Sequence, residues 1–244
     1  MTDAARHDPA EAGAPADGAP SHHIRSYVRR EGRITAAQEE ALEQLWPRYG
    51  IDPAGVLLDL PAIFGRQAPL AVEIGFGSGD HLLASAQARP DTDFLGIEVH
   101  RPGAGRVLQQ ADKLGLSNLR VLCADAVEVL RQCLPAGSLD EVVIFFPDPW
   151  PKKRHQKRRL VQPAFVEVLA RALRPGGRLR LATDWADYAR HMLEVMSAAP
   201  QFANASESGG AIARPADRPL TRFESRGLRL GHEVADFEFV RRPA

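Results

Sequence analysis

Short apolar segments of strand length alternate with segments of helical spacing along most of this chain. The apolar segments are residues 70–74, 94–98, 119–123, 141–146 and 178–182. The segments of helical spacing are residues 80–88, 103–114, 162–173 and 186–197. Because strands that alternate with helices form a parallel sheet covered on both faces, the pattern predicts an α/β fold with a doubly wound, mostly parallel sheet.

The segments at either end of this pattern complete the expected fold. From Phe202 onward, and especially over residues 234–240, the chain can supply two last strands, which makes the expected sheet seven-stranded. Near the start, Thr35 can cap a short helix that runs to Leu45, and Pro47 is expected to end it. The Arg-Pro-Gly-Gly run at 174–177 is expected to stop the helix before the last parallel strand.

Composition separates a tail from one folded domain. Residues 1–20 are rich in Ala, Pro, Gly and Asp, with no large apolar residue after Met1, which predicts a disordered tail. Residues 21–244 are expected to form a single domain, with residues 21–65 as an N-terminal extension. No apolar run is long enough to span a bilayer, and the N-terminus lacks the apolar core of a secretory signal. Cys123 and Cys133 have no metal-ligand or redox spacing. This predicts two buried free thiols in the cytoplasm, with a disulfide as the alternative.

Charge is balanced overall but unevenly distributed. Lys and Arg number 31, and so do Asp and Glu, so the whole chain is not a basic binder. The bases gather in residues 25–33, 152–159 and 214–229. A neutral protein can still present a cationic face to a polyanion. The alternative is that these bases form a solvated surface without a binding role.

The first strand ends in a glycine-rich turn that contains Gly75, Gly77 and Gly79. Such a turn lets the backbone lie against a ligand at the carboxyl end of a parallel sheet, although alone it is weak evidence for a nucleotide site. A dinucleotide fingerprint would carry its third glycine where this chain has Asp80, whose carboxylate would repel a pyrophosphate. A P-loop is excluded because no Gly-Lys-Ser/Thr follows.

Three acids follow three strands, and together they favour S-adenosylmethionine over other nucleotides. Glu73 ends the first strand, near the expected amino-acid end of the cofactor. Glu98 ends the second strand, where a ribose diol would lie, and Asp125 follows the third, where it could receive the adenine amine. An acidic pocket suits a sulfonium and an ammonium group. Taken singly, each acid could equally be a helix cap or a solvated strand end.

The most informative segment follows the fourth strand. Pro147 and Pro149 flank Asp148 and restrict its backbone, which suits a reacting group that must be positioned before the substrate arrives. Trp150 and the cationic run 152–159 follow at once. An acid beside an aromatic ring and a basic run indicates chemistry on a nucleic acid. Trp150 could stack on a base or anchor the loop in the core, and both readings stay open.

With these motifs aligned, residues 24–241 resemble the bacterial tRNA (guanine-46-N7)-methyltransferase family. The Gly-rich turn is shared by many methyltransferases. Specificity comes from the Pro-Asp-Pro-Trp-Pro-Lys-Lys-Arg-His run that begins at Pro147 and from the Thr-Arg-Phe-Glu segment that begins at Thr221. The Ile-Arg-Ser-Tyr-Val-Arg-Arg run from Ile24 and the Ala-Thr-Asp-Trp run from Ala182 add to the resemblance. At Arg222 relatives often carry Lys, and the charge is kept.

The resemblance implies a Rossmann-like class I methyltransferase sandwich and assigns roles to residues. The cofactor-binding set for S-adenosyl-L-methionine is Glu73, Gly75, Gly77, Gly79, Glu98, Asp125 and Asp148, with Asp148 also the catalytic acid. The substrate-binding set is Lys152, Asp184, Thr221, Arg222, Phe223 and Glu224. The RNA-binding set is Arg154, His155, Gln156, Lys157, Arg158 and Arg159. Residues 21–65 are expected to pack on or near this RNA-binding face, the partner is tRNA, and the protein is expected to be a monomer without a metal.

The chemistry defines the task of Asp148. Guanine N7 already carries an in-plane lone pair, so no proton has to be removed before it attacks a methyl group. We therefore expect Asp148 to orient guanine through its N1 and N2 protons and to offset charge that develops on the ring, without acting as an obligate general base. The alternatives are a methyltransferase that acts on adenine N6, another nucleic acid, a protein or a small molecule, and an RNA-binding module with a vestigial cofactor pocket. A dehydrogenase ranks last because of Asp80.

Overall fold

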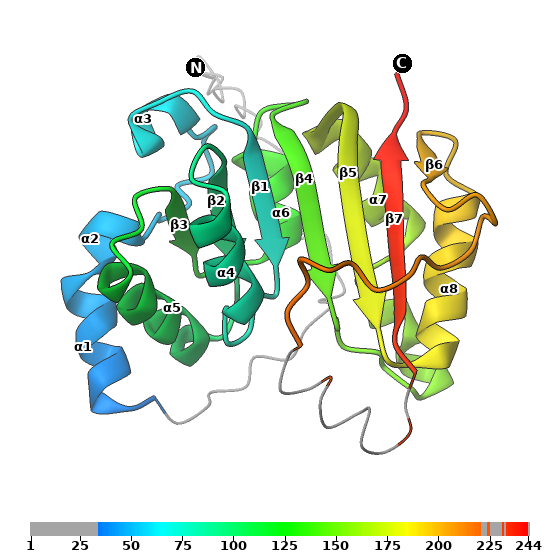
Figure 1. The fold of residues 1–244 in the computed structure, drawn as a ribbon, viewed down its shortest axis with the longest axis horizontal. Helices are drawn as coiled ribbons and strands as arrows, with labels where there is room; N and C mark the ends of the chain where they lie inside the picture. Colours follow the sequence, from blue (N-terminus) through cyan, green and yellow to red (C-terminus); the bar gives the residue numbers. More distant parts are fainter. Residues whose placement is uncertain (1–33, 221–223, 225–230, 232, 244) are drawn as a thin grey trace, which may run out of the picture.

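One seven-stranded sheet organises the molecule, with helices on both of its faces (Figure 1). The structure is a computed structural model, and it describes residues 34–220, 224, 231 and 233–243. The strand order is β3-β2-β1-β4-β5-β7-β6, in which β1 to β5 pair in parallel and β7 runs antiparallel between β5 and β6. The predicted α/β class and the seven strands are confirmed.

The strands follow the apolar segments closely. Their bounds are β1 Leu70–Ile74, β2 Asp93–Ile97, β3 Leu119–Leu122, β4 Leu139–Phe145, β5 Leu173–Thr183, β6 Phe202–Asn204 and β7 Ala235–Arg241. The helices around the sheet are α4 Asp80–Ala88, α5 Arg101–Lys113, α6 Ala126–Gln132, α7 Pro163–Ala172 and α8 Ala186–Ser197. Before the sheet come α1 Ala36–Gln44, α2 Trp46–Tyr49 and α3 Leu60–Phe64, and the 3₁₀ turn η1 Lys153–Arg158 follows β4. The sequence pattern missed α2, α3 and α6, all of which are short.

Two boundaries differ from the expectation, and proline explains the first. Thr35 caps α1 through a capping box with Gln38, as expected, but Pro47 lies in the first turn of α2 instead of ending α1. Proline is tolerated there because the first turn of a helix has no partners for its N–H groups. At the other boundary, α7 ends at Ala172, before the Arg-Pro-Gly-Gly run. That run lies within the bounds of β5, where the pairing register shifts between Leu139 and Glu141.

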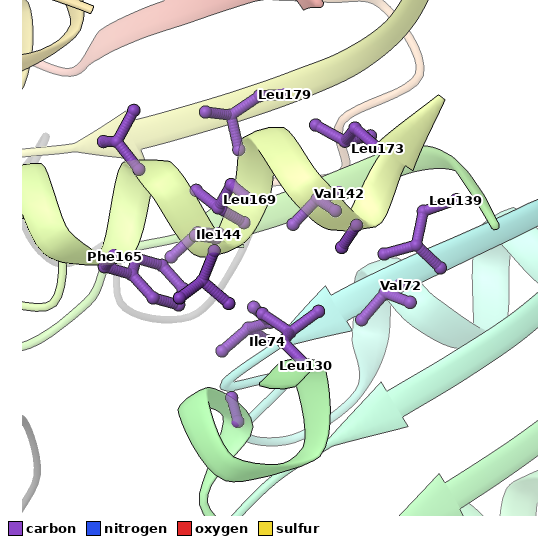
Figure 2. Close-up of a cluster of buried hydrophobic side chains, with 14 of the residues drawn as sticks. Val72, Ile74, Leu130, Leu139, Val142, Ile144, Phe165, Leu169, Leu173 and Leu179 are labelled. Atoms are coloured by element: carbon purple, nitrogen blue, oxygen red, sulfur yellow. The ribbon is translucent and has the colours of Figure 1, made fainter. Parts of the chain in front are cut away.

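The core fills both faces of the sheet. On one face, side chains from β1, β4 and β5 pack with those of α6 and α7, and Figure 2 shows Ile74, Ile144, Leu130 and Phe165 in this cluster. On the other face, α4 and α5 cover β1, β2 and β3 in a second cluster. Successive residues of a strand point to opposite faces, so the side chains of β1 alternate between the two clusters. This packing fixes where each strand ends, and with it the residues that follow.

Helix α1 of the N-terminal extension lies against α5 at the β3 edge (Figure 1). Gln38 Nε2 donates to the Pro102 carbonyl at 3.0 Å, and Gln109 Nε2 donates to the Ala37 carbonyl at 2.6 Å. The placement of residues 21–65 near an RNA-binding face stays a prediction. The tail and the basic cluster 25–33 fall outside the described residues.

Two features of the described residues bear on the class of protein. Cys123 and Cys133 are free thiols, as the sequence predicted; Cys133 is buried, whereas Cys123 is half-buried, and desolvation raises the pKa of Cys123 to about 11. In the part of the chain that the structure describes, there is no helix long and apolar enough to cross a membrane.

Candidate cofactor and substrate site

A cavity of about 390 Å³ opens at the carboxyl ends of β1, β2 and β4. Along the chain the strand order moves outward from β1 to β3 and then restarts on the other side of β1 with β4. The cavity lies at this switch point, which is where open α/β sheets bind their ligands. Its lining includes Gly75, Gly77, Glu98, Asp125 and Asp148. Five of the seven residues predicted to bind the cofactor therefore lie around one cavity.

The glycine turn has a backbone conformation that strongly favours glycine at three positions. The φ angles are +73° at Gly75, +53° at Gly77 and +75° at Gly79, in the left-handed region that side chains disfavour. Gly79 starts α4, and a Cβ there would lie 2.1 Å from Val107 Cγ2. Gly103, in the first turn of α5, packs so closely that its own Cβ would lie 2.3 Å from the Gly77 carbonyl oxygen. Sequence reasoning did not identify Gly103, whose only signal was a glycine in a helix.

Glu98 holds the turn from the second strand. Its Oε2 accepts from the backbone N–H of Gly77 at 2.9 Å, and its Oε1 accepts from Val99 and His100 at 2.8 and 3.1 Å. These bonds fix the carboxylate at the cavity wall. Since each carboxylate oxygen has two lone pairs, the group keeps acceptor capacity for a ligand diol.

Asp125 combines a capping role with a position on the cavity. Its Oδ1 accepts a hydrogen bond from Val127 N at 2.8 Å, which makes Asp125 the N-cap of α6. The capping alternative is therefore confirmed for this acid. Its residue also lines the cavity, next to Ala124 and Ala126. The capping hydrogen bond holds the carboxylate in one orientation and involves Oδ1, not Oδ2.

Glu73 lies elsewhere than its two companions. It is buried, is not among the lining residues, and accepts a hydrogen bond from His81 Nδ1 at 2.7 Å. His81 contacts Ser85 Oγ at 3.3 Å and meets the Phe145 ring edge-on at 4.9 Å between ring centroids. Because side chains alternate along β1, Glu73 points toward α4 while Ile74 faces the cavity. Its contact with a cofactor stays a prediction.

The loop that carries Asp148 is strained at both ends. Asp148 is exposed at the cavity rim. Among the residues that the structure describes, two that are not glycine have positive φ, and they flank Asp148: Phe146 at +52° and Trp150 at +44°. Such a conformation costs about 1–3 kcal/mol for each residue and persists only where neighbouring contacts enforce it. Sequence analysis anticipated a stiff loop from Pro147 and Pro149, but it could not identify the strain.

The basic run after the loop divides into an exposed part and a buried part. Lys152, Lys153, Arg154 and Lys157 are exposed, and we call them the cationic strip. His155 and Arg158 turn back onto Trp150 instead. The His155 ring meets it edge-on at 6.0 Å, and the Arg158 guanidinium lies 5.0 Å from its ring centroid. Gln156 donates to Asp187 Oδ2 at 3.1 Å.

Arg159 is the member of the predicted RNA-binding set whose placement differs most from the expectation. Only 3% of its surface is exposed. Its Nε donates to the Pro149 carbonyl at 2.9 Å, its Nη2 donates to Asp187, and its guanidinium lies 4.9 Å from the Tyr188 ring centroid. The bond from Arg159 lowers the pKa of Asp187, which keeps that carboxylate ionised. Its side chain is therefore held inside the protein, and a contact of Arg159 with the RNA backbone stays a prediction.

Glu224 is also buried, with 1% of its surface exposed. Arg218 binds it in a bidentate pair at 2.7 and 2.8 Å and also donates to Asp236 at 2.9 Å. The Arg218 guanidinium lies 5.6 Å from the Phe145 ring centroid and 5.5 Å from that of Phe146. Arg218 therefore pairs with both oxygens of the Glu224 carboxylate, and direct substrate contact by Glu224 stays a prediction.

Of the remaining predicted substrate residues, the structure describes Lys152, in the cationic strip, and Asp184. Asp184 follows β5 and is half-buried, next to the exposed Trp185. Thr221, Arg222 and Phe223 fall outside the described residues. Among the described residues, no cluster of His, Cys, Asp or Glu has the arrangement of a metal site.

Comparison with known proteins agrees with this geometry. Residues 67–237 match a family model described as "Putative methyltransferase". Among solved structures, the 16S rRNA methyltransferase KamB has a TM-score of 0.54 at 17% identity, covering 88% of this chain and 97% of its own. A 16S rRNA (adenine(1408)-N(1))-methyltransferase W203A mutant with cosubstrate SAM from Catenulisporales acidiphilia has a TM-score of 0.52 at 18% identity, covering 79% and 92%. At these identities the likeness concerns the fold, and it confirms the class I methyltransferase architecture.

Sequence relatives are much nearer than these structures. The tRNA (guanine-N(7)-)-methyltransferase of Chromohalobacter salexigens is 56% identical over 226 residues, which is 92% of this chain and 92% of the relative. The enzyme of the same name from Escherichia coli K12 is 55% identical over 225 residues, 92% of this chain and 94% of the relative. Identity at this level over nearly the full length of both proteins settles the family: the chain belongs to the tRNA (guanine-N(7)-)-methyltransferases.

Proposed function

We propose that this protein transfers a methyl group from S-adenosylmethionine to N7 of the variable-loop guanine, position 46, of tRNA in the cytoplasm. The observation that carries the proposal is the position of Asp148. This exposed carboxylate lies at the rim of the cavity, and the cationic strip begins four residues later. One short loop thus joins a small-molecule cavity to a surface that suits a polyanion.

The cavity suits S-adenosylmethionine in size and in charge. A volume of about 390 Å³ is in the range of small-molecule sites. The fixed carboxylate of Glu98 would receive the ribose hydroxyls, and Asp125 would receive the adenine amine beside the apolar wall of Ile97 and Ala124. Acids around the cavity attract a cationic ligand and disfavour a pyrophosphate. The glycine turn lets the backbone approach the ligand without a side chain between them.

The residues of the chain would act by position and charge. When bound, the cofactor supplies an electrophilic methyl group on a cationic sulfur, which the N7 lone pair of guanine can attack without prior loss of a proton. Asp148 would accept from the N1 and N2 protons and so direct N7 toward the cavity. Its negative charge would offset the positive charge that the purine gains. Alignment of this kind contributes roughly 7–11 kcal/mol to a bimolecular reaction.

Reaching N7 in a folded tRNA requires withdrawal of the base from its tertiary contacts. Unstacking and unpairing cost a few kcal/mol. Phosphate contacts by the cationic strip would offset this cost, and Trp150, already covered on one side by Arg158, stands beside the rim.

The test is methyl transfer from labelled S-adenosylmethionine to unmodified tRNA, followed by nucleoside analysis. We expect 7-methylguanosine, and none when the variable-loop guanine is replaced by adenine. Methyladenosine in the product would instead support an adenine methyltransferase. Cofactor binding without any transfer would support the non-catalytic module.

The cationic strip predicts a steep salt dependence of tRNA binding. If its four cations each meet a phosphate, the slope of log K against log salt is about −2.8 to −3.6. Replacing Lys153 and Lys157 together by Ala should make the slope shallower by roughly 1.4–1.8. Filter binding between 50 and 300 mM salt measures it, with Lys113→Ala, an exposed lysine at the end of α5, as the matched control. An unchanged slope in the double variant would remove the strip from the interface.

A further inference from the structure

The loop from Phe146 to Trp150 is strained at two residues, and each strained end touches a buried arginine. Phe146 and Trp150 both have positive φ angles. Prolines at 147 and 149 limit the loop but cannot impose a left-handed conformation on their neighbours, because proline fixes only its own φ and disfavours the α region before it. Contacts from outside the loop have to enforce the strain.

Arg159 holds the C-terminal end of the loop. Its Nε–H donates to the Pro149 carbonyl, which is the peptide group directly before Trp150. Asp187 and the Tyr188 ring, both in the first turn of α8, fix the guanidinium. One buried side chain, that of Arg159, therefore links Pro149 to α8.

Arg218 holds the N-terminal end. Its guanidinium lies against the Phe145 and Phe146 rings, and the carboxylates of Glu224 and Asp236 clamp it. Glu224 directly follows the 221–223 segment, and Asp236 belongs to β7. The Phe146 end of the loop is thereby tied through Arg218 to Glu224, a residue for which the resemblance implies substrate contact.

We propose that Arg159 and Arg218 are positioning residues that brace the strained loop from both ends and hold Asp148 over the cavity. Neither touches the reacting atoms in this account. The inference rests on the proposed function for what Asp148 does, but the brace itself is a property of the fold. It also gives Arg159, a member of the basic run, a role different from phosphate binding.

A substitution that keeps the charge separates the two roles. Lysine would still attract a phosphate, but its single ammonium group cannot reach Pro149 and Asp187 together while lying flat on Tyr188. We expect Arg159→Lys to lower kcat at saturating tRNA by about 10-fold or more, within the ~10²-fold that a misplacement of 1 Å costs. The salt slope of tRNA binding should stay as in the wild type.

Local trypsin cleavage reports on the loop independently of activity. The exposed residues Lys152, Lys153 and Arg154 follow the loop closely in the sequence. Loss of the brace should therefore speed trypsin cleavage after these residues, and mass spectrometry identifies the cleavage sites. The matched control is Arg120→Lys in β3. Arg120 also stacks on an aromatic ring, Phe64 at 5.0 Å, and also donates to a backbone carbonyl, that of Ile63 at 2.9 Å, away from the loop. Arg120→Lys should leave kcat and the rate of trypsin cleavage at the cationic strip unchanged.

Two further variants keep the proposal testable if Arg159→Lys folds poorly. Asp187→Ala removes a half-exposed partner of Arg159 and should give a smaller loss of kcat in the same direction. Arg218→Lys should reproduce the loss of kcat and the faster cleavage from the other end. A shallower salt slope with kcat retained would overturn the brace in favour of a phosphate contact, and wild-type values of kcat and cleavage would overturn it outright. If wild-type protein itself transfers no methyl group, the proposed function fails, while the cleavage result still decides the brace.

Discussion

Replacing Asp148 by Asn is expected to lower kcat about 10²-fold while cofactor binding stays measurable. The substitution removes a negative charge from the place where the purine becomes positive, and a placed charge or donor of this kind contributes about 10²–10³ in rate. It also replaces one acceptor with an amide N–H₂, which cannot pair with the N1 and N2 protons of guanine. Steady-state kinetics at saturating tRNA, with calorimetry for the cofactor, measures both quantities. Unchanged kcat with intact cofactor binding would remove Asp148 from the chemistry.

A change on the substrate side tests which guanine atoms Asp148 contacts. Inosine at position 46 lacks the N2 amine, so it should slow the wild-type enzyme but have little further effect on Asp148→Asn. Groups in direct contact give effects that do not add. If the two losses simply add, Asp148 acts without contacting the N2 amine.

The second large effect is expected at Gly103, away from the catalytic loop. A Cβ in Gly103→Ala would lie 2.3 Å from the Gly77 carbonyl oxygen, so the glycine turn has to move. Moving it disturbs the bond from Gly77 N to Glu98 and shifts the wall that would receive the cofactor. We expect the Kd for S-adenosylmethionine to rise at least about 10-fold, which corresponds to roughly 1.4 kcal/mol. Calorimetric titration measures it.

Gly105 provides the matched control in the same helix. A Cβ in Gly105→Ala would lie 2.7 Å from the Gln38 carbonyl oxygen, so this substitution strains the contact between α5 and α1. It should lower the Tm and leave the cofactor Kd within about twofold, because α1 does not line the cavity. Equal effects of the two substitutions on Kd would mean that helix packing in general, and not the glycine turn, controls cofactor binding.

Sequence periodicity predicted the sheet well because buried strands and amphipathic helices leave strong local signals. The same signals placed Glu98, Asp125 and Asp148 at strand ends, and in a parallel sheet these ends meet at one edge. The short α6 was missed, although its cap, Asp125, had been identified for another reason. A single residue can serve as a helix cap and line a cavity, and sequence alone does not separate the two roles.

The sequence could not predict which charged side chains turn inward. Arg158 and Arg159 stand side by side with Lys157 in one basic run, yet only Lys157 is exposed. The partners that bury Arg159 are Pro149, Asp187 and Tyr188, and two of them belong to a helix 28 residues or more away along the chain. Glu224 is buried for a similar reason, since its partner Arg218 packs on β4 residues remote in sequence. Such pairings depend on the tertiary fold, which local patterns do not encode.

The central claim is that one loop presents guanine N7 to a methyl donor, and a tRNA with 7-deazaguanine at position 46 tests it most directly. This base keeps the N1 and N2 protons and the ring face but carries carbon in place of N7. The account predicts that such a tRNA binds with unchanged affinity, competes with unmodified tRNA and accepts no methyl group. Methylation of the 7-deazaguanine tRNA at the wild-type rate would contradict it, because the methyl group would then be going to another atom.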